Sequence, residues 1–271
     1  MIENKKPIIS PSQVSSYTRC GEAYRRRYIE KEITPPGGAL ARGSSIHKGA
    51  ELNFAQKISS RTDLPRQDVV DCAVSTYEEI VKHEGVYLDP EEEARGKDIV
   101  VAETKDSTAR LAGVLMDEVV GKHQPALVEE KIELNLESST HNLVGIIDMK
   151  TEAGNIVDLK TSKKTWSPDK VASDAQFTFY AMLDQAKTGK PPKPIIVENI
   201  VDLKKPKSVS FITERGMDDF KPLIQRINAV IDGIAKGNFA PAPADSWACS
   251  PKYCGYWQTC RYVNNKRSII S

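Results

Sequence analysis

Two strand-like segments with a tight turn between them constrain the fold of this chain more than any other feature. Residues 143–150 and 156–161 are rich in aliphatic side chains, and Ala153-Gly154-Asn155 separates them. So short a connection joins antiparallel neighbours. The chain is therefore predicted to contain a β-hairpin, around which the rest of the fold has to be built.

Charged side chains gather at one edge of this hairpin. Asp158 and Lys160 are two positions apart, so they share one face of the second strand, and Asp148 ends the first strand where it can approach that face. Two carboxylates and the backbone carbonyl of Leu159 are oxygen ligands of the kind that Mg²⁺ and Mn²⁺ prefer. A lysine beside such an ion can stabilise charge on a phosphate. These residues alone leave open the alternative of a surface ion pair on an amphipathic hairpin.

The segments around the hairpin predict a mixed α/β fold. Before it we expect helices at residues 10–32, 40–56 and 66–122, a strand at 127–136 and a turn at 138–139. After it we expect a helix at 173–187, strands at 195–201 and 208–213, and an amphipathic helix at 216–236. We expect a single domain over residues 1–271, with a helical part (10–122), a core of central sheet and flanking helices (123–240) and a cysteine tail (241–262).

The charge balance combines two unlike regions. The 271 residues carry a net charge of +1. Residues 1–48 hold 9 basic and 4 acidic residues and residues 245–271 hold 4 and 1, whereas the rest of the chain holds 25 and 32. Basic ends have the sign that attracts a polyanion. With no apolar run near the roughly 18 residues of a membrane span and no signal-peptide stretch at the N-terminus, we expect no membrane association and a cytoplasmic location.

Three of the five cysteines crowd into the last 23 residues, as Cys249, Cys254 and Cys260. In a reducing compartment such crowding is more typical of metal or cluster ligation than of disulfides. Three thiolates are one short of a tetrahedral set. The residues themselves leave two candidates for the fourth ligand, Cys20 and Cys72.

Asp148 together with Asp158-Leu159-Lys160 resembles the core of the PD-(D/E)xK nuclease superfamily. More narrowly, the chain resembles the RecB-like exonucleases that carry an iron–sulfur cluster, such as the CRISPR-associated exonucleases and AddB-type nuclease domains. The resemblance runs from about residue 10 to residue 262. It implies a restriction-endonuclease-like core and a Mg²⁺- or Mn²⁺-dependent deoxyribonuclease.

The resemblance extends to residues outside the hairpin. Residues 42–47, within the helix expected over 40–56, are similar to the family's helix that supplies a metal-binding histidine, here His47, although a lone histidine is more often structural. Gln176 and Tyr180 match the family's Q-x-x-x-Y motif, and their spacing puts both on one helix face. The family often has a glutamate on the strand before the hairpin. Spacing favours Glu129 and strand parity favours Glu130, so this assignment stays open.

The resemblance also selects the cysteine ligands. The family has one cysteine near its N-terminus and three near its C-terminus, which implies that Cys20 completes the set, with Cys72 left as a buried side chain. Four thiolates suit a 4Fe–4S cluster of mainly structural role or, as the alternative, zinc. The spacing C-x4-C-x5-C departs from the family's commoner C-x2-C-x5-C. Aromatic and basic side chains of the tail either stack DNA bases or wrap the cluster: Tyr253, Tyr256, Trp257, Arg261 and Tyr262.

The sequence therefore predicts a metal-dependent DNA exonuclease or end-processing nuclease. His47, Asp148 and Asp158 would hold the ion, and Lys160 would stabilise the charge on the phosphate. Gln176 and Tyr180 would position the DNA strand. The alternative is a non-catalytic DNA-binding or scaffold module in a repair, CRISPR or phage complex. Cleavage polarity, the choice between single strands and duplex ends, protein partners and oligomeric state are not determined by the sequence.

Overall fold

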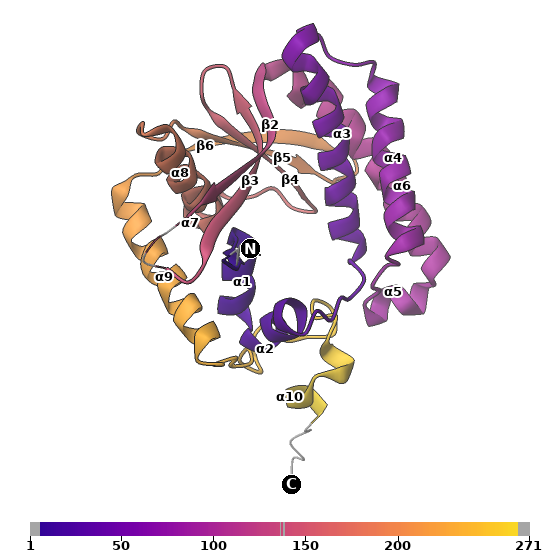
Figure 1. Ribbon diagram of the computed structural model, residues 1–271. Coiled ribbons are helices and arrows are strands. Elements are labelled where there is room, and N and C mark those ends of the chain that lie inside the picture. Colours follow the sequence, from indigo (N-terminus) through magenta and orange to yellow (C-terminus); the bar gives the residue numbers. More distant parts are fainter. Residues whose placement is uncertain (1–5, 136, 138, 265–271) are drawn as a thin grey trace, which may run out of the picture.

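The predicted hairpin lies in the middle of a six-stranded mixed sheet (Figure 1). The computed structural model describes residues 6–135, 137 and 139–264, so residues 136 and 138 of the predicted strand end and turn lie outside it. The sheet order is β1-β3-β4-β5-β6, with β2 paired to β3. The strands are β1 (Ile8–Ile9), β2 (Pro125–Leu134), β3 (Asn142–Thr151), β4 (Ile156–Ser162), β5 (Ile195–Val201) and β6 (Lys207–Thr213).

Strand β3 is the branch point of this sheet. On one edge it pairs antiparallel with β2 along most of its length. On its other edge it pairs with β1 at Asn142 and Leu143, and with β4 only at Met149 and Lys150. Between these contacts no described strand pairs with that edge, because β4 leaves β3 and runs parallel to β5. The sheet therefore forks at the point where Asp148 lies.

Helices cover both faces of the sheet (Figure 1). On one face pack α3 (Gly38–Ser60), α4 (Arg66–His83) and α6 (Lys97–Val114), and on the other α7 (Pro168–Ser173), α8 (Ala175–Thr188) and α9 (Met217–Ala235). Each face has its own apolar core. The α3-face cluster includes Phe54, Leu111 and Val157, and the α8-face cluster includes Phe177 and Ile147. The predicted mixed α/β core with a helical insert is confirmed.

The helix expected over 66–122 is interrupted, which the sequence analysis missed. Helix α4 ends at His83, and α5 (Pro90–Arg95) begins at a capping box formed by Asp89. Gly85 and Gly96 have φ of 78° and 94°, a left-handed conformation that glycine adopts at little cost. After α6 the chain continues as a π-helical turn (Leu115–Val119) and a 3₁₀ turn (Val120–Lys122).

The helix expected over 10–32 is also wrong as a single element, because the chain extends at Cys20. Its φ of −162° and ψ of 103° separate α1 (Pro11–Arg19) from α2 (Gly21–Tyr24), which continues into a π-helical turn (Arg25–Ile29). The Gly21 N–H donates to the carbonyl of Ala240 at 2.7 Å, so the start of the tail is fixed against α2. The tail ends in a 3₁₀ turn (Trp257–Thr259) and α10 (Arg261–Asn264). In the described ranges, no helix has the length and apolarity that crossing a membrane requires.

Candidate metal centre and active site

Three possible metal ligands from three different elements meet at the fork of the sheet. His47 of α3, Glu129 of β2 and Asp148 of β3 each offer one ligand atom, and these atoms lie within 4.8 Å of one another. The Nδ1 atom of His47 is 3.4 Å from Oδ2 of Asp148. The same Oδ2 accepts the backbone N–H of Leu159 at 2.9 Å, which ties Asp148 to the neighbouring strand.

A second polar chain continues from β4 to α8. Lys160 Nζ donates to Oδ1 of Asp158 at 3.0 Å and to Oε1 of Gln176 at 3.0 Å. The Gln176 side-chain amide donates to the Tyr180 hydroxyl at 2.7 Å. Asp174 caps α8 by accepting the N–H of Gln176 at 2.9 Å, which fixes the start of the helix that carries both residues. The predicted partners Asp158, Lys160, Gln176 and Tyr180 therefore do meet.

The electrostatics of the site reflect three carboxylates close together, of which Asp158 is fully buried and Asp148 and Glu129 are partly exposed. Burial raises the pKa of Asp158 to about 6, although Lys160 opposes the shift. Burial, and then the charge of Asp148, raises the pKa of Glu129. Burial alone would lower the pKa of His47, but Asp148 raises it to about 9, and His47 in turn lowers the pKa of Asp148 against its burial. Ionising neighbouring carboxylates costs free energy because their charges repel, and a bound divalent cation would lower that cost.

The donor set fits a hard divalent ion. Carboxylate oxygens with one imidazole nitrogen are ligands suited to Mn²⁺ or Mg²⁺. One buried oxygen, Oδ2 of Asp158, accepts no hydrogen bond from the described residues, although Lys160 Nζ lies 2.8 Å away. That ammonium group neutralises the Asp158 carboxylate, so an ion is expected at the neighbouring cluster of His47, Glu129 and Asp148. That the Leu159 carbonyl takes part stays a prediction.

The structure distinguishes the two candidate glutamates. The carboxylate of Glu129 lies in the ligand cluster, whereas Glu130 accepts a hydrogen bond from Lys187 of α8. Strand parity failed here because Glu129 has a φ of 48° and interrupts the alternation. Val128 consequently packs against the α3-face cluster, while Ile132 packs on the α8 face. Regular alternation would have put both on one face.

Sequence reasoning also missed a buried residue that supports the site. Asn199 of β5 is fully buried, and its amide donates to the carbonyl of Lys160 at 3.3 Å and to Oγ of Ser162 at 2.9 Å. Its Oδ1 accepts the N–H of Trp166 at 2.9 Å. Asn199 thus holds the end of the strand that carries Lys160. The signal available in the sequence was a polar side chain inside an apolar strand.

The four predicted cysteine ligands come together in the fold. Cys20, Cys249, Cys254 and Cys260 line one cavity of about 930 Å³, whereas Cys72 lies on α4 and does not line it. Sγ of Cys20 accepts the N–H groups of Ala23 and Ala242 at 3.5 and 3.3 Å. Burial, and then the neighbouring thiols, raises the pKa of Cys249.

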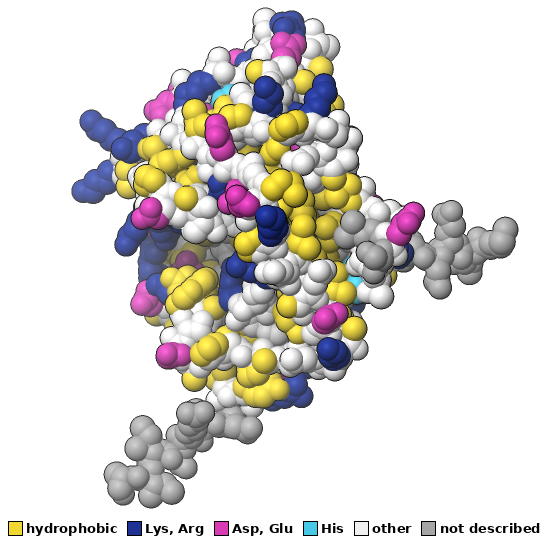
Figure 2. Space-filling view, turned by 90° about the vertical axis from the view of Figure 1, so that its left-hand side faces the viewer, with side chains coloured by type: hydrophobic (Ala, Val, Ile, Leu, Met, Phe, Trp, Pro, Cys, Tyr) yellow, Lys and Arg dark blue, Asp and Glu magenta, His cyan; other side chains and the backbone are white. Residues whose placement is uncertain are grey.

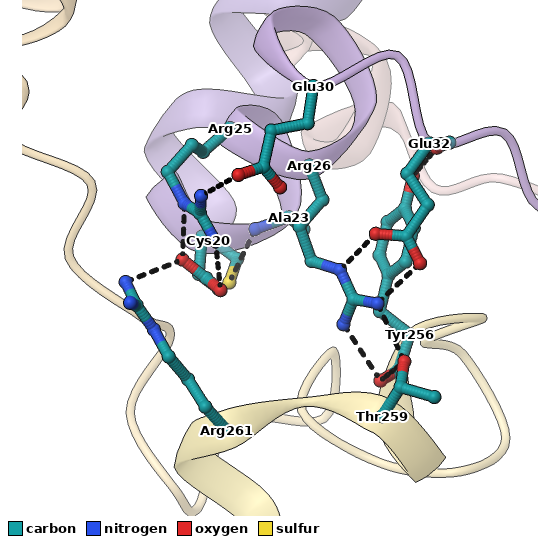
Figure 3. Close-up of polar contacts among 10 residues, drawn as sticks. Cys20, Ala23, Arg25, Arg26, Glu30, Glu32, Tyr256, Thr259 and Arg261 are labelled. Carbon is teal, nitrogen blue, oxygen red and sulfur yellow. Dashed lines mark hydrogen bonds and ion pairs between the residues drawn. The ribbon is translucent and has the colours of Figure 1, made fainter.

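Polar contacts hold the cysteine tail against α2 and the turn after it (Figure 3). Arg26 binds the carboxylate of Glu32, the hydroxyl of Thr259 at 2.6 Å and the carbonyl of Tyr256 at 3.4 Å. The Tyr256 hydroxyl donates to the carbonyl of Glu32 at 2.7 Å, and Arg26 stacks over the Tyr256 ring. Tyr256 is therefore a buried packing residue. Tyr253 is 60% exposed, as is Trp247 at 62%, and the sequence analysis had not singled out Trp247.

The fold and the site together define a nuclease core: a forked mixed sheet with an Asp and an Asp-x-Lys set at the fork. The sequence model of the PD-(D/E)XK nuclease superfamily matches residues 8–261. The chain belongs to this superfamily, whose substrates are nucleic acids and whose members usually use divalent metals.

One solved structure supports this fold. A protein named "Putative exonuclease" from Eubacterium rectale is 13% identical, with a TM-score of 0.56 over 98% of this chain and 90% of its own. The structure of SSO0001 is 12% identical, with a TM-score of 0.46 over 96% of this chain and 88% of its own. No curated protein matches the chain significantly.

Proposed function

We propose that this protein is a metal-dependent DNA exonuclease or DNA end-processing nuclease, acting as a single domain over residues 1–271. The observation that carries the proposal is the cluster of His47, Glu129 and Asp148 beside the Asp158–Lys160 pair. The name of the Eubacterium rectale protein with this fold supports exonucleolytic rather than internal cleavage.

The residues of the site have separate roles in this proposal. His47, Glu129, Asp148 and Asp158, with the Leu159 carbonyl, would hold one or two Mg²⁺ or Mn²⁺ ions. A bound ion supplies an activated water and offsets negative charge on the scissile phosphate. The Lys160 ammonium, fixed between Asp158 and Gln176, stabilises the charge that builds up on that phosphate.

Gln176 and Tyr180 position the DNA strand. Burial, followed by the charges of Asp158 and Asp148, raises the pKa of Tyr180. The Tyr180 hydroxyl therefore stays protonated and can donate a hydrogen bond to a phosphate oxygen. The Gln176 amide, held between Lys160 and Tyr180, couples the position of that hydroxyl to the position of the ammonium group.

We further propose that Cys20, Cys249, Cys254 and Cys260 hold a 4Fe–4S cluster with a mainly structural role, as in the RecB-like exonucleases. The observation that supports a shared site is that all four cysteines line one cavity of about 930 Å³. Four thiolates suit a 4Fe–4S cluster, with zinc as the alternative. Work inside a recombination, CRISPR or replication complex stays a prediction.

Digestion of end-labelled single- and double-stranded DNA with Mn²⁺ tests the function. Asp148→Ala and Lys160→Ala should abolish cleavage, while Lys164→Ala, which removes a lysine from the exposed loop after β4, should leave it unchanged. Cleavage that persists in both site variants would overturn the proposal. Wild-type protein that binds DNA without cutting it would instead support a scaffold role. Brown colour, with iron and sulfide found by analysis, tests the cluster separately.

A further inference from the structure

A groove leads away from the site through the fork of the sheet. It has a volume of about 830 Å³ and lies between α1 and α8, with residues 144–146 of β3 along its floor. Lys160, Gln176 and Tyr180 line one end of it. Lys160 and Tyr180 also line the cavity that contains His47, Glu129 and Asp148. A chain that enters the groove therefore passes directly into the proposed active site.

The groove is basic. Among the described residues, its lining has one carboxylate, Asp174, which caps α8. Its basic side chains are Arg19, Lys131, Lys160 and Arg226. On the face shown in Figure 2, Lys and Arg side chains gather along the left-hand margin and border a hollow. A basic groove beside a phosphate-cleaving site has the charge that a nucleic acid strand requires.

Among the residues that the structure describes, two arginines that line the groove form no ion pair with a carboxylate. The Arg19 guanidinium of α1 donates to the Ser15 hydroxyl at 3.2 Å and lies over the ring of Trp247, and the second arginine is Arg226 of α9. Both also line an adjoining cavity of about 340 Å³, so they border the same two hollows from two helices. Guanidinium groups without a carboxylate partner along one groove suit the phosphates of a strand that lies in it.

Aromatic side chains continue the surface beyond Arg19. Its guanidinium lies 5.3 Å from the centre of the Trp247 ring, and Trp247 packs edge-on against Tyr253 with ring centres 5.1 Å apart. Both rings are more than half exposed. Trp247 and Tyr253 line the cysteine cavity of about 930 Å³, and Arg19 lines both that cavity and the groove, so the two surfaces are continuous. Exposed rings beside a basic groove are the combination that binds single strands by stacking.

We propose that a single strand of DNA runs from the metal centre through this groove, with its phosphates held by Arg19 and Arg226 and a base stacked on Trp247. The proposal rests on the nuclease function proposed above. A volume of about 830 Å³ falls within the roughly 300–1,000 Å³ of small-ligand sites, so it encloses a few nucleotides of one strand.

Binding in EDTA, measured by fluorescence polarisation with a labelled oligonucleotide and a blunt duplex of equal length, tests the groove without cleavage. Single strands should bind about tenfold tighter than the duplex. Arg19→Gln and Arg226→Gln should each lower the affinity severalfold and reduce the slope of log K against log salt by about 0.7, and the double variant by about 1.4. Lys236→Gln, at the end of the same helix as Arg226 but outside the groove, should bind like wild type.

The aromatic contact has its own variants. Trp247→Ala should weaken single-strand binding by about tenfold, and Trp247→Phe, which keeps a ring, should restore most of it. A double arginine variant with wild-type affinity and salt slope, or a preference for duplex, would overturn the groove assignment. If the wild-type protein cuts DNA and these variants bind DNA as tightly as it does, the groove proposal is wrong while the proposed nuclease function stands. A wild-type protein that neither binds nor cuts DNA refutes the function beneath it.

Discussion

Gly145→Ala should destabilise the fold and disturb the site together. Gly145 lies on β3 beneath α8, where a Cβ would come within 2.6 Å of Cδ1 of Leu183 and 3.3 Å of two ring carbons of Tyr180. Leu183 is fully buried, so its side chain cannot retreat without displacing its neighbours. Overpacking of this kind costs about 1–3 kcal/mol. The loss of backbone entropy in the unfolded chain returns about 0.4–1 kcal/mol, which leaves a net loss of up to about 2.6 kcal/mol, with a central value of about 1.3 kcal/mol.

Urea unfolding of wild type, Gly145→Ala and Gly121→Ala measures this loss. A Cβ on Gly121 meets no atom within 4 Å, so this variant is the matched control and should unfold at the wild-type midpoint or slightly above it. Below the transition, Gly145→Ala should also cleave DNA more slowly, because Tyr180 is pushed away from Gln176. A Gly145→Ala midpoint no lower than that of Gly121→Ala would refute the packing argument.

Three further predictions follow from the site and its supports. Glu129→Gln should reduce the Mn²⁺-dependent rise in Tm by removing a ligand, whereas Glu130→Gln should not; equal effects would contradict the assignment. Burial opposes ionisation of Glu198, but hydrogen bonds from His123 and Ser210 hold its folded-state pKa below the ordinary 4.5. The ionised Glu198 therefore contributes its full stabilisation above pH 4.5, and this contribution is lost as the pH falls through the lower folded-state pKa. Urea midpoints should therefore fall more steeply in acid for wild type than for Glu198→Gln, and parallel curves would refute this. Cys254→Ser should lose bound iron and lower Tm, while Cys72→Ser should keep both; retention of iron by the first variant would remove Cys254 from the ligand set.

Local patterns predicted the parts of the site that depend on local geometry. Alternation along one strand placed Asp158 and Lys160 on one face, and the i, i+4 spacing placed Gln176 and Tyr180 on one side of a helix. These relations survive in the structure because a regular strand or helix fixes them whatever the rest of the chain does. Glu129 shows the limit of this reasoning. Its left-handed backbone breaks the alternation, and nothing in the residues nearby announces it.

The sequence by itself determined the class of fold, the central hairpin and the residue types that meet at its edge, because backbone periodicity and side-chain chemistry are local properties. Only the tertiary structure decided that β3 divides its edge between β1 and β4, since strand pairing joins residues far apart in the chain. Helix packing beside this sheet also places Arg19 and Arg226 along one groove, from helices more than 200 positions apart. An arrangement of that kind depends on the packing of whole elements, which no spacing within one segment encodes.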